Sequence, residues 1–183
     1  VLPYFKKMES YQGGTDEYRG RDGPLHVHRS IPEDELSQAF LRAGKEAGYP
    51  ESNDLSGYRQ EGFGGFDRTV FKGERWSTAR AYLDPARHRQ NLNIQTNTHV
   101  QRIIFEGFRA KSVLYKTKKG ETKRVEATKE IILSAGAIGT PHLLMLSGVG
   151  PASHLKENDV GLIKNIPGVG QNLNDHPDFV LKY

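Results

Sequence analysis

The stretch "SAGAIGTPHLLMLSGVG", residues 134–150, is the most informative part of this chain for its fold. It follows "KEIILS" (129–134), an apolar and β-branched run whose length and composition predict a β-strand. Thr140 followed by Pro141 is typical of a helix N-cap with proline in the first helical position. Gly148 suits the position after a helix, where φ is positive. The stretch therefore predicts a strand, a turn of small residues and a short apolar helix.

Such a turn has two interpretations. Its backbone N–H groups and the helix N-terminus point toward one spot, which suits an anion or the edge of a bound cofactor. The same arrangement is also common as a tight packing turn in an α/β domain. The local pattern leaves both interpretations open.

A helix is also predicted over residues 30–50, with Ser30 as its cap and with Gly48 and Pro50 ending it. Its buried stripe is expected to consist of Leu36, Ala39, Phe40 and Ala43.

From Leu92 onward strands dominate, and a turn at Lys119-Gly120 predicts a β-hairpin. We interpret the lysines on its arms as protection of an exposed sheet edge. This mixed order of helices and strands favours an α/β or α+β fold.

Composition excludes several classes of function. The 183 residues, 36% of them hydrophobic, can bury one moderate core or parts of two. The absence of cysteine excludes disulfides, thiolate metal sites and cysteine nucleophiles from this sequence. The seven histidines show no metal-ligand spacing, so no metal is predicted, and no apolar run approaches the ~20 residues that cross a bilayer. The formal net charge of +4 is dispersed, and we predict no nucleic-acid partner.

The order of residues resembles the glucose–methanol–choline (GMC) flavin oxidoreductases. Gly136-Ala137-x-x-Thr140-Pro141-x-Leu143-Leu144-x-x-Ser147-Gly148-Val149-Gly150 is similar, at every fixed position, to the second signature of that family. Further stretches resemble its landmarks in family order: "VLPYFKKME" (1–9), "YRGRDGPLHV" (18–27), "AGYP" (47–50), "EGFGGFDRTVFKGERWSTARAYLDPA" (61–86) and "IPGVGQNLNDHP" (166–177). Within the family, the chain is most similar to the choline dehydrogenase branch.

The resemblance implies a mixed α/β fold, with a partial FAD-binding domain of GMC type and part of the substrate-binding domain. Residues 1–90 are then mostly substrate domain. Residues 91–183 are mostly FAD domain and lead back to the substrate side. Enzymes of the family are much longer, so the chain is expected to be an internal segment. The dinucleotide-binding G-x-G-x-x-G belongs upstream and the catalytic His and its His/Asn partner downstream, so no catalytic residue is expected here.

The resemblance also implies FAD as the cofactor and assigns four residues to it. The main chain of Val100 is expected to bond the adenine, although a buried β-branched strand residue is an adequate alternative interpretation. Strand alternation would put Val100, Arg102 and Ile104 on one face. Ala135, Gly136 and Ala137 are expected beside the adenosine half, where a larger side chain would push the backbone off the cofactor.

The polar cluster "NLNDHPD" (172–178) resembles a family loop that passes the flavin and the substrate cavity. Asp175 and His176 are then candidates to line the site, and Asp178 is a candidate to attract the cation of choline. Each residue taken alone is equally a loop cap.

The implied reaction oxidises a small alcohol, with choline favoured and betaine aldehyde as the product, by hydride transfer to flavin. Electrons pass to a quinone or another acceptor. A sugar or another alcohol as substrate is an alternative, and so is a non-catalytic truncated product that serves as a binding or structural domain. The resemblance favours a mitochondrial, inner-membrane-associated location, and leaves cytoplasmic or secreted locations open.

The first prediction concerns the 183-residue chain alone. We expect it to be catalytically inactive and to bind FAD weakly, because no G-x-G-x-x-G follows a strand in it to hold the pyrophosphate. The absorbance spectrum of the purified chain tests this. A yellow protein with a stoichiometric flavin band would contradict the prediction.

Overall fold

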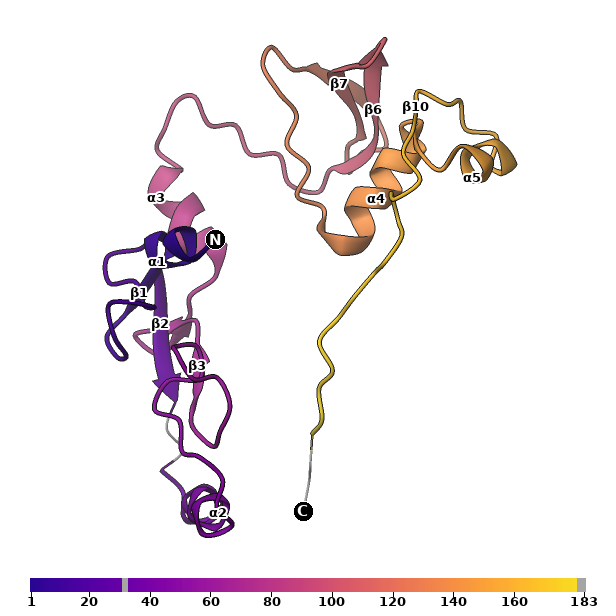
Figure 1. The fold of residues 1–183 in the computed structure, drawn as a ribbon. Coiled ribbons are helices and arrows are strands. Elements are labelled where there is room, and N and C mark those ends of the chain that lie inside the picture. Colours follow the sequence, from indigo (N-terminus) through magenta and orange to yellow (C-terminus); the bar gives the residue numbers. More distant parts are fainter. Residues whose placement is uncertain (31–32, 181–183) are drawn as a thin grey trace. The chain divides into compact units, whose positions relative to one another are not determined.

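The computed structural model describes residues 1–30 and 33–180, and the chain divides into two compact units, Val1–Asn93 and Ile94–Tyr183 (Figure 1). Their assignment to a substrate domain and an FAD domain stays a prediction.

A small three-stranded sheet organises the first unit. Its order is β1-β2-β3, with β1 parallel to β2 and β3 antiparallel to β2. The elements of this unit are α1 (Leu2–Met8), β1 (Glu9–Tyr11), β2 (Leu25–Ser30), α2 (Glu35–Glu46), β3 (Phe66–Arg68), β4 (Val70–Phe71), β5 (Glu74–Arg75), the π-helical turn η1 (Ala79–Leu83) and α3 (Asp84–Ala86). Beside the sheet, β4 and β5 form a hairpin.

The core of this unit is a network of charges. The side chain of Arg19 is only 2% exposed and contacts Glu9 at 2.8 Å, and Asp54 and Asp67 at 3.0 Å each. Arg29 binds the same two aspartates, also at 3.0 Å. Because a buried guanidinium is tolerated only when it is paired, the network fixes the loops that carry these carboxylates.

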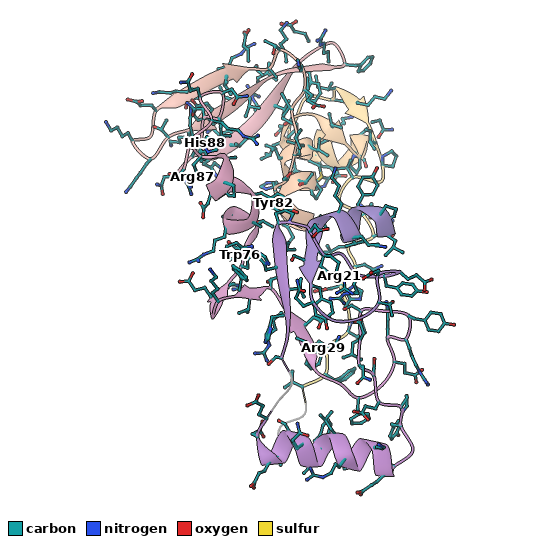
Figure 2. All side chains as sticks on the ribbon, turned by 90° about the vertical axis from the view of Figure 1, so that its left-hand side faces the viewer. Arg21, Arg29, Trp76, Tyr82, Arg87 and His88 are labelled. Carbon is teal, nitrogen blue, oxygen red and sulfur yellow. The ribbon has the colours of Figure 1, made fainter. Side chains whose placement is uncertain are left out.

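Tyr11 completes this core. The guanidinium carbon of Arg19 lies 3.9 Å from the centre of its ring, a cation–π contact. Burial and the nearby charge of Asp67 raise the pKa of the Tyr11 hydroxyl. Arg21, labelled in Figure 2, donates to the main-chain carbonyls of Tyr11 and Gly13 at 2.6 and 2.8 Å, which holds the loop after β1 in place.

The helix predicted over residues 30–50 is present as α2, but it is shorter. Asp34, not Ser30, caps it by accepting a hydrogen bond from the Ser37 N–H, which lowers the pKa of Asp34. Ser30 lies in β2 instead. Gly48, with φ of +84°, follows the helix end as expected.

The expected buried stripe of α2 is wrong. Leu36 is 76% exposed, and Ala39, Phe40 and Ala43 are exposed as well. The helix meets the unit through Gly44, where an added Cβ would lie 2.6 Å from the ring of Phe63. Only a residue without a side chain admits that ring at this position. Phe40 of the predicted stripe also contacts Phe63, with the ring centres 5.2 Å apart, but it remains 49% exposed.

The second unit is built on an antiparallel meander in the order β6-β7-β8. Its elements are β6 (His99–Glu106), β7 (Arg109–Lys116), β8 (Thr122–Glu126), α4 (Gly136–Leu146), β9 (Val149–Gly150), α5 (Ala152–Glu157) and β10 (Lys164–Asn165). The hairpin predicted at Lys119-Gly120 is confirmed, with φ of +84° at Gly120. The short strands β9 and β10 pair in parallel.

The strand predicted over residues 129–134 is not formed, because these residues are an irregular connection between β8 and α4. A strand exists only where a neighbour satisfies its backbone groups, and none of the described strands pairs with this segment.

Helix α4 lies beside β6 (Figure 1), and the hydroxyl of Ser147 links the two elements. Ser147, the C-cap of α4, donates from Oγ to the carbonyl of Leu143 at 2.6 Å and accepts the N–H of Ile103 on β6 at 2.8 Å. Ser147 and Ile103 are both buried. The predicted positive φ at Gly148 is confirmed at +86°, and an added Cβ there would meet the carbonyl oxygen of Gly161 at 2.4 Å.

We therefore expect Ser147→Ala to lower the free energy of unfolding by about 1–3 kcal/mol, because it leaves the buried N–H of Ile103 without an acceptor. Urea denaturation measures the change. The control is Ser153→Ala on the exposed face of α5, which should leave the midpoint nearly unchanged. Equal effects of the two substitutions would show that the Ser147 hydroxyl does not join the elements.

Candidate cofactor-binding site

The turn that opens α4 has the geometry of a close-approach site. Gly136 has φ of +82°, a conformation that favours glycine, and Ala135 before it caps the helix without a side-chain hydrogen bond. An added Cβ at Gly136 would meet no described atom within 4 Å. Ala135, Gly136 and Ala137 are all exposed. The glycine is thus not required by packing within the described chain, and both space and uncapped N–H groups remain for a ligand.

The start of α4 corrects the sequence prediction. The helix begins at Gly136, four residues before Thr140, so Thr140 is not the cap and Pro141 lies inside the helix. Pro141 has no N–H, and the helical bond to the carbonyl of Ala137 cannot form. The lost hydrogen bond lies in the first turns of the helix. Gly139 is also tightly placed there, because an added Cβ would lie 3.1 Å from the Cβ of Ala135. The carbonyl of Ala137 is left as a further polar group at the site.

Val100 lies near the start of β6, opposite Tyr115 on β7, and is 39% exposed. A register shift follows it, because Arg102 pairs with Leu114 and Gln101 is the extra residue of a bulge. Val100 therefore does not share a face of the strand with Arg102 and Ile104, and the predicted common face is wrong for Val100. Among the described strands, β6 pairs only with β7, so alternate main-chain groups on its other side are not used by the sheet.

These residues belong to one unit, and the contact that joins their elements lies at the far end of α4. The hydrogen bond between Ser147 and Ile103 holds the C-terminal end of α4 on β6. Because Gly136 begins the same helix, this bond also fixes the position of Gly136 relative to β6.

The substrate-side candidates are not brought to this turn by the described contacts. Asp175, His176 and Asp178 lie in an extended, exposed segment without regular secondary structure. The only side-chain hydrogen bond described for them is local, from the N–H of His176 to Asp175 Oδ1 at 2.8 Å. Their role as site residues stays a prediction.

Sequence reasoning missed the charge network of the first unit and a cavity of about 460 Å³ next to it. The residues around this cavity come from β1, β2, α2 and two glycine-containing loops, and they include Tyr11, Arg29, Leu41, Ser52 and Phe63. No local signal could have revealed the network, because Asp54 and Asp67 lie 35 and 48 residues from Arg19.

The described residues, 1–30 and 33–180, contain no group of three or more acidic, histidine or cysteine side chains arranged to hold a metal ion. None of their helices has the length and apolar character needed to span a membrane.

Comparison with known proteins identifies the class. The family model described as GMC oxidoreductase matches residues 1–178. The chain is 51% identical over 175 residues to mitochondrial choline dehydrogenase of Mus musculus, a match that covers 96% of this chain and 29% of that protein. It is 48% identical over 186 residues to oxygen-dependent choline dehydrogenase 1 of Chromohalobacter salexigens, covering 100% of this chain and 33% of the relative. The chain belongs to the GMC oxidoreductase family and spans about a third of the length of these relatives.

Solved structures agree with this assignment. An FAD-dependent oxidoreductase from Chaetomium thermophilum superimposes with a TM-score of 0.86 at 33% identity, over 95% of this chain and 32% of that one. Pyridoxine 4-oxidase from Mesorbium loti gives 0.84 at 33% identity, over 91% and 33% of the two chains. The mixed α/β fold of an FAD-binding GMC region, expected from the resemblance, is confirmed, and FAD is the cofactor that the family and its structures indicate.

The turn at Gly136 generates a test in the full-length protein. We expect Gly136→Ala to weaken FAD binding at least about tenfold, equivalent to roughly 1.4 kcal/mol, while turnover per bound flavin changes little. The reason is that a Cβ enters the space left for the cofactor without touching the reacting atoms. Flavin content per polypeptide, measured by absorbance, gives the result.

Gly107→Ala is the matched control for this test. Gly107 also has positive φ (+58°) and also has no described atom within 4 Å of an added Cβ, but it lies in the β6–β7 turn. Both substitutions therefore strain the backbone, and only the one at Gly136 should release flavin. Equal flavin loss in the two variants would assign the effect to strain alone.

Proposed function

We propose that this chain is a segment of an FAD-dependent alcohol dehydrogenase that oxidises choline to betaine aldehyde. The observation that carries the proposal is the 51% identity to a choline dehydrogenase across 96% of this chain, which includes the turn at Gly136. When bound, FAD supplies the redox chemistry by accepting a hydride from the alcohol carbon. The chain itself contributes binding and position.

On the cofactor side, Ala135, Gly136 and Ala137 receive the adenosine half of FAD against the exposed start of α4. The support is the positive φ of Gly136 and the free space around it. The main chain of Val100 bonds the adenine. This is supported by the position of Val100 on β6, whose outer side has main-chain groups left over from sheet pairing.

On the substrate side, Asp178 attracts the trimethylammonium group, and Asp175 and His176 line the site. A quaternary ammonium has no N–H to donate, so a protein holds it by a nearby carboxylate or by aromatic faces. The support for Asp178 is its negative charge and its exposure, which leaves the carboxylate open to a ligand.

Electrons then pass to a quinone or another acceptor, and the enzyme works in mitochondria. The location is supported by mitochondrial choline dehydrogenases of mouse and human among the relatives, alongside bacterial ones of similar identity.

A different alcohol is the second candidate substrate. Pyridoxine 4-oxidase shares the fold at 33% identity, so this scaffold accommodates another alcohol in a relative. Turnover of choline against a panel of sugar and aromatic alcohols by the full-length protein separates the candidates. A higher kcat/KM for another alcohol would overturn the choline assignment, and no turnover with bound FAD would favour a non-catalytic role.

The substrate prediction concerns Asp178→Asn in the full-length protein. We expect the KM for choline to rise at least about tenfold, equivalent to roughly 1.4 kcal/mol of lost cation binding, because the change removes charge and keeps shape. The uncharged isostere 3,3-dimethylbutanol should be little affected. Steady-state kinetics with both alcohols gives the answer.

Asp159→Asn is the control, since Asp159 is an exposed aspartate in the turn after α5. It makes the same change in net charge and should leave both KM values unchanged. If Asp178→Asn impairs the two alcohols equally, the residue has a structural role.

A further inference from the structure

The tip of the β7–β8 hairpin gathers four lysines at one end of the meander. We call Lys116, Lys118, Lys119 and Lys123 the lysine tip, and all four are exposed. Lys116 ends β7, Lys123 lies on β8, and the turn between the strands carries Lys118 and Lys119. This turn is closed by two backbone hydrogen bonds of 2.9 Å, from the Thr117 N–H to the Glu121 carbonyl and from the Gly120 N–H to the Thr117 carbonyl. The charges are therefore held together by an ordered turn.

The lysine tip lies in a positively charged part of the chain. Residues 106–130 contain eight lysines and arginines and four glutamates, an excess of four. Within the tip, Glu121 pairs with Lys123 at 3.1 Å. In the part of the chain that the structure describes, no carboxylate lies within 4.0 Å of the ammonium groups of Lys116, Lys118 or Lys119.

Edge protection explains Lys123 but not Lys118 and Lys119. Charges that block strand addition have to lie along the free edge of the sheet, as Lys123 and Arg124 do on β8. The last ladder pair is Lys116 with Thr122, so Lys118 and Lys119 lie beyond the ladder. These two lysines lie in the turn that joins β7 and β8, past the end of the sheet, where no further strand can pair.

The opposite end of the meander has a different character. There Lys111 contacts Glu106 at 3.7 Å, and the ammonium group of Lys164 lies 5.1 Å from the centre of the Phe108 ring. Unneutralised positive charge is therefore concentrated at the β7–β8 end.

We propose that the lysine tip is an electrostatic docking surface for a bilayer that contains anionic phospholipids. Lysines near a bilayer surface are attracted to its anionic headgroups, and a fluid layer of charged headgroups needs no complementary shape. The tip consists of lysines, which act as hydrated point charges, whereas bidentate phosphate recognition favours arginine.

Nucleic acid fits the tip less well. Single-stranded nucleic acids are held by exposed aromatic rings on which bases stack, and the aromatic residue nearest the tip in sequence, Tyr115, is buried.

The experiment uses the full-length protein with its cofactor and is independent of the choline assignment, because it measures binding to vesicles and not turnover. Co-sedimentation is measured with vesicles of phosphatidylcholine and phosphatidylserine and with vesicles of phosphatidylcholine alone. We expect binding only to the first kind. The double substitution Lys118→Glu and Lys119→Glu should lower the partition coefficient at least about tenfold, as should 0.5 M salt, in which the Debye length is only about 4 Å.

Two variants separate the tip from general charge. Lys7→Glu with Lys156→Glu makes the same change in net charge at exposed sites outside the tip, and should keep most of the binding. Lys118→Arg with Lys119→Arg keeps the charge and should bind like the natural protein. Flavin content and turnover should be unchanged in all of them, which shows that the variants fold.

Three outcomes would overturn the proposal. One is equal binding to both kinds of vesicle. Another is equal loss of binding in the two charge-reversed variants. The third is that a DNA duplex displaces the protein from the anionic vesicles when the DNA phosphate is less concentrated than the lipid phosphate. That result would assign the tip to nucleic acid.

Discussion

The second unit depends on one hydroxyl that serves two backbone groups. Ser147 Oγ bonds the carbonyl of Leu143 within α4 and the N–H of Ile103 on β6, and both bonds are buried. A buried donor without an acceptor is costly, so this bond fixes the contact between α4 and β6. The turn at Gly136 lies at the other end of the same helix. The candidate cofactor site is therefore positioned by a hydrogen bond made eleven residues away from it.

The first unit obtains its order in a different way, through charge. Arg19 and Arg29 share the carboxylates of Asp54 and Asp67, and Tyr11 packs against Arg19. Burial tends to lower the pKa of Arg29, but its hydrogen bond to Asp67 and the charge of that carboxylate outweigh this and raise it. Removing one partner would leave a buried charge unpaired, so we infer that the network specifies the course of its loops more than it adds stability.

The two candidate halves of the site differ in what supports them. The turn at Gly136 has a positive φ that favours glycine, free space and uncapped N–H groups, all within one unit. The segment with Asp175, His176 and Asp178 has only charge and exposure. The chain spans about a third of the length of these relatives. Geometry therefore argues for FAD more strongly than for choline.

Four features could be predicted from the sequence, because each follows from the order of residues along the chain. They are the family, the mixed fold, the hairpin at Lys119-Gly120 and the positive φ of Gly148. Whether residues 129–134 form a strand depended on tertiary structure, since a strand requires a neighbour. The burial of α2 depended on it as well, since the ring of Phe63 lies against Gly44 and leaves Leu36 and Phe40 exposed. Tertiary structure also decided the start of α4, where Pro141 is tolerated within the helix. The partners of Arg19 belong to this second group, because charges separated by 35 and 48 residues meet only when the chain folds.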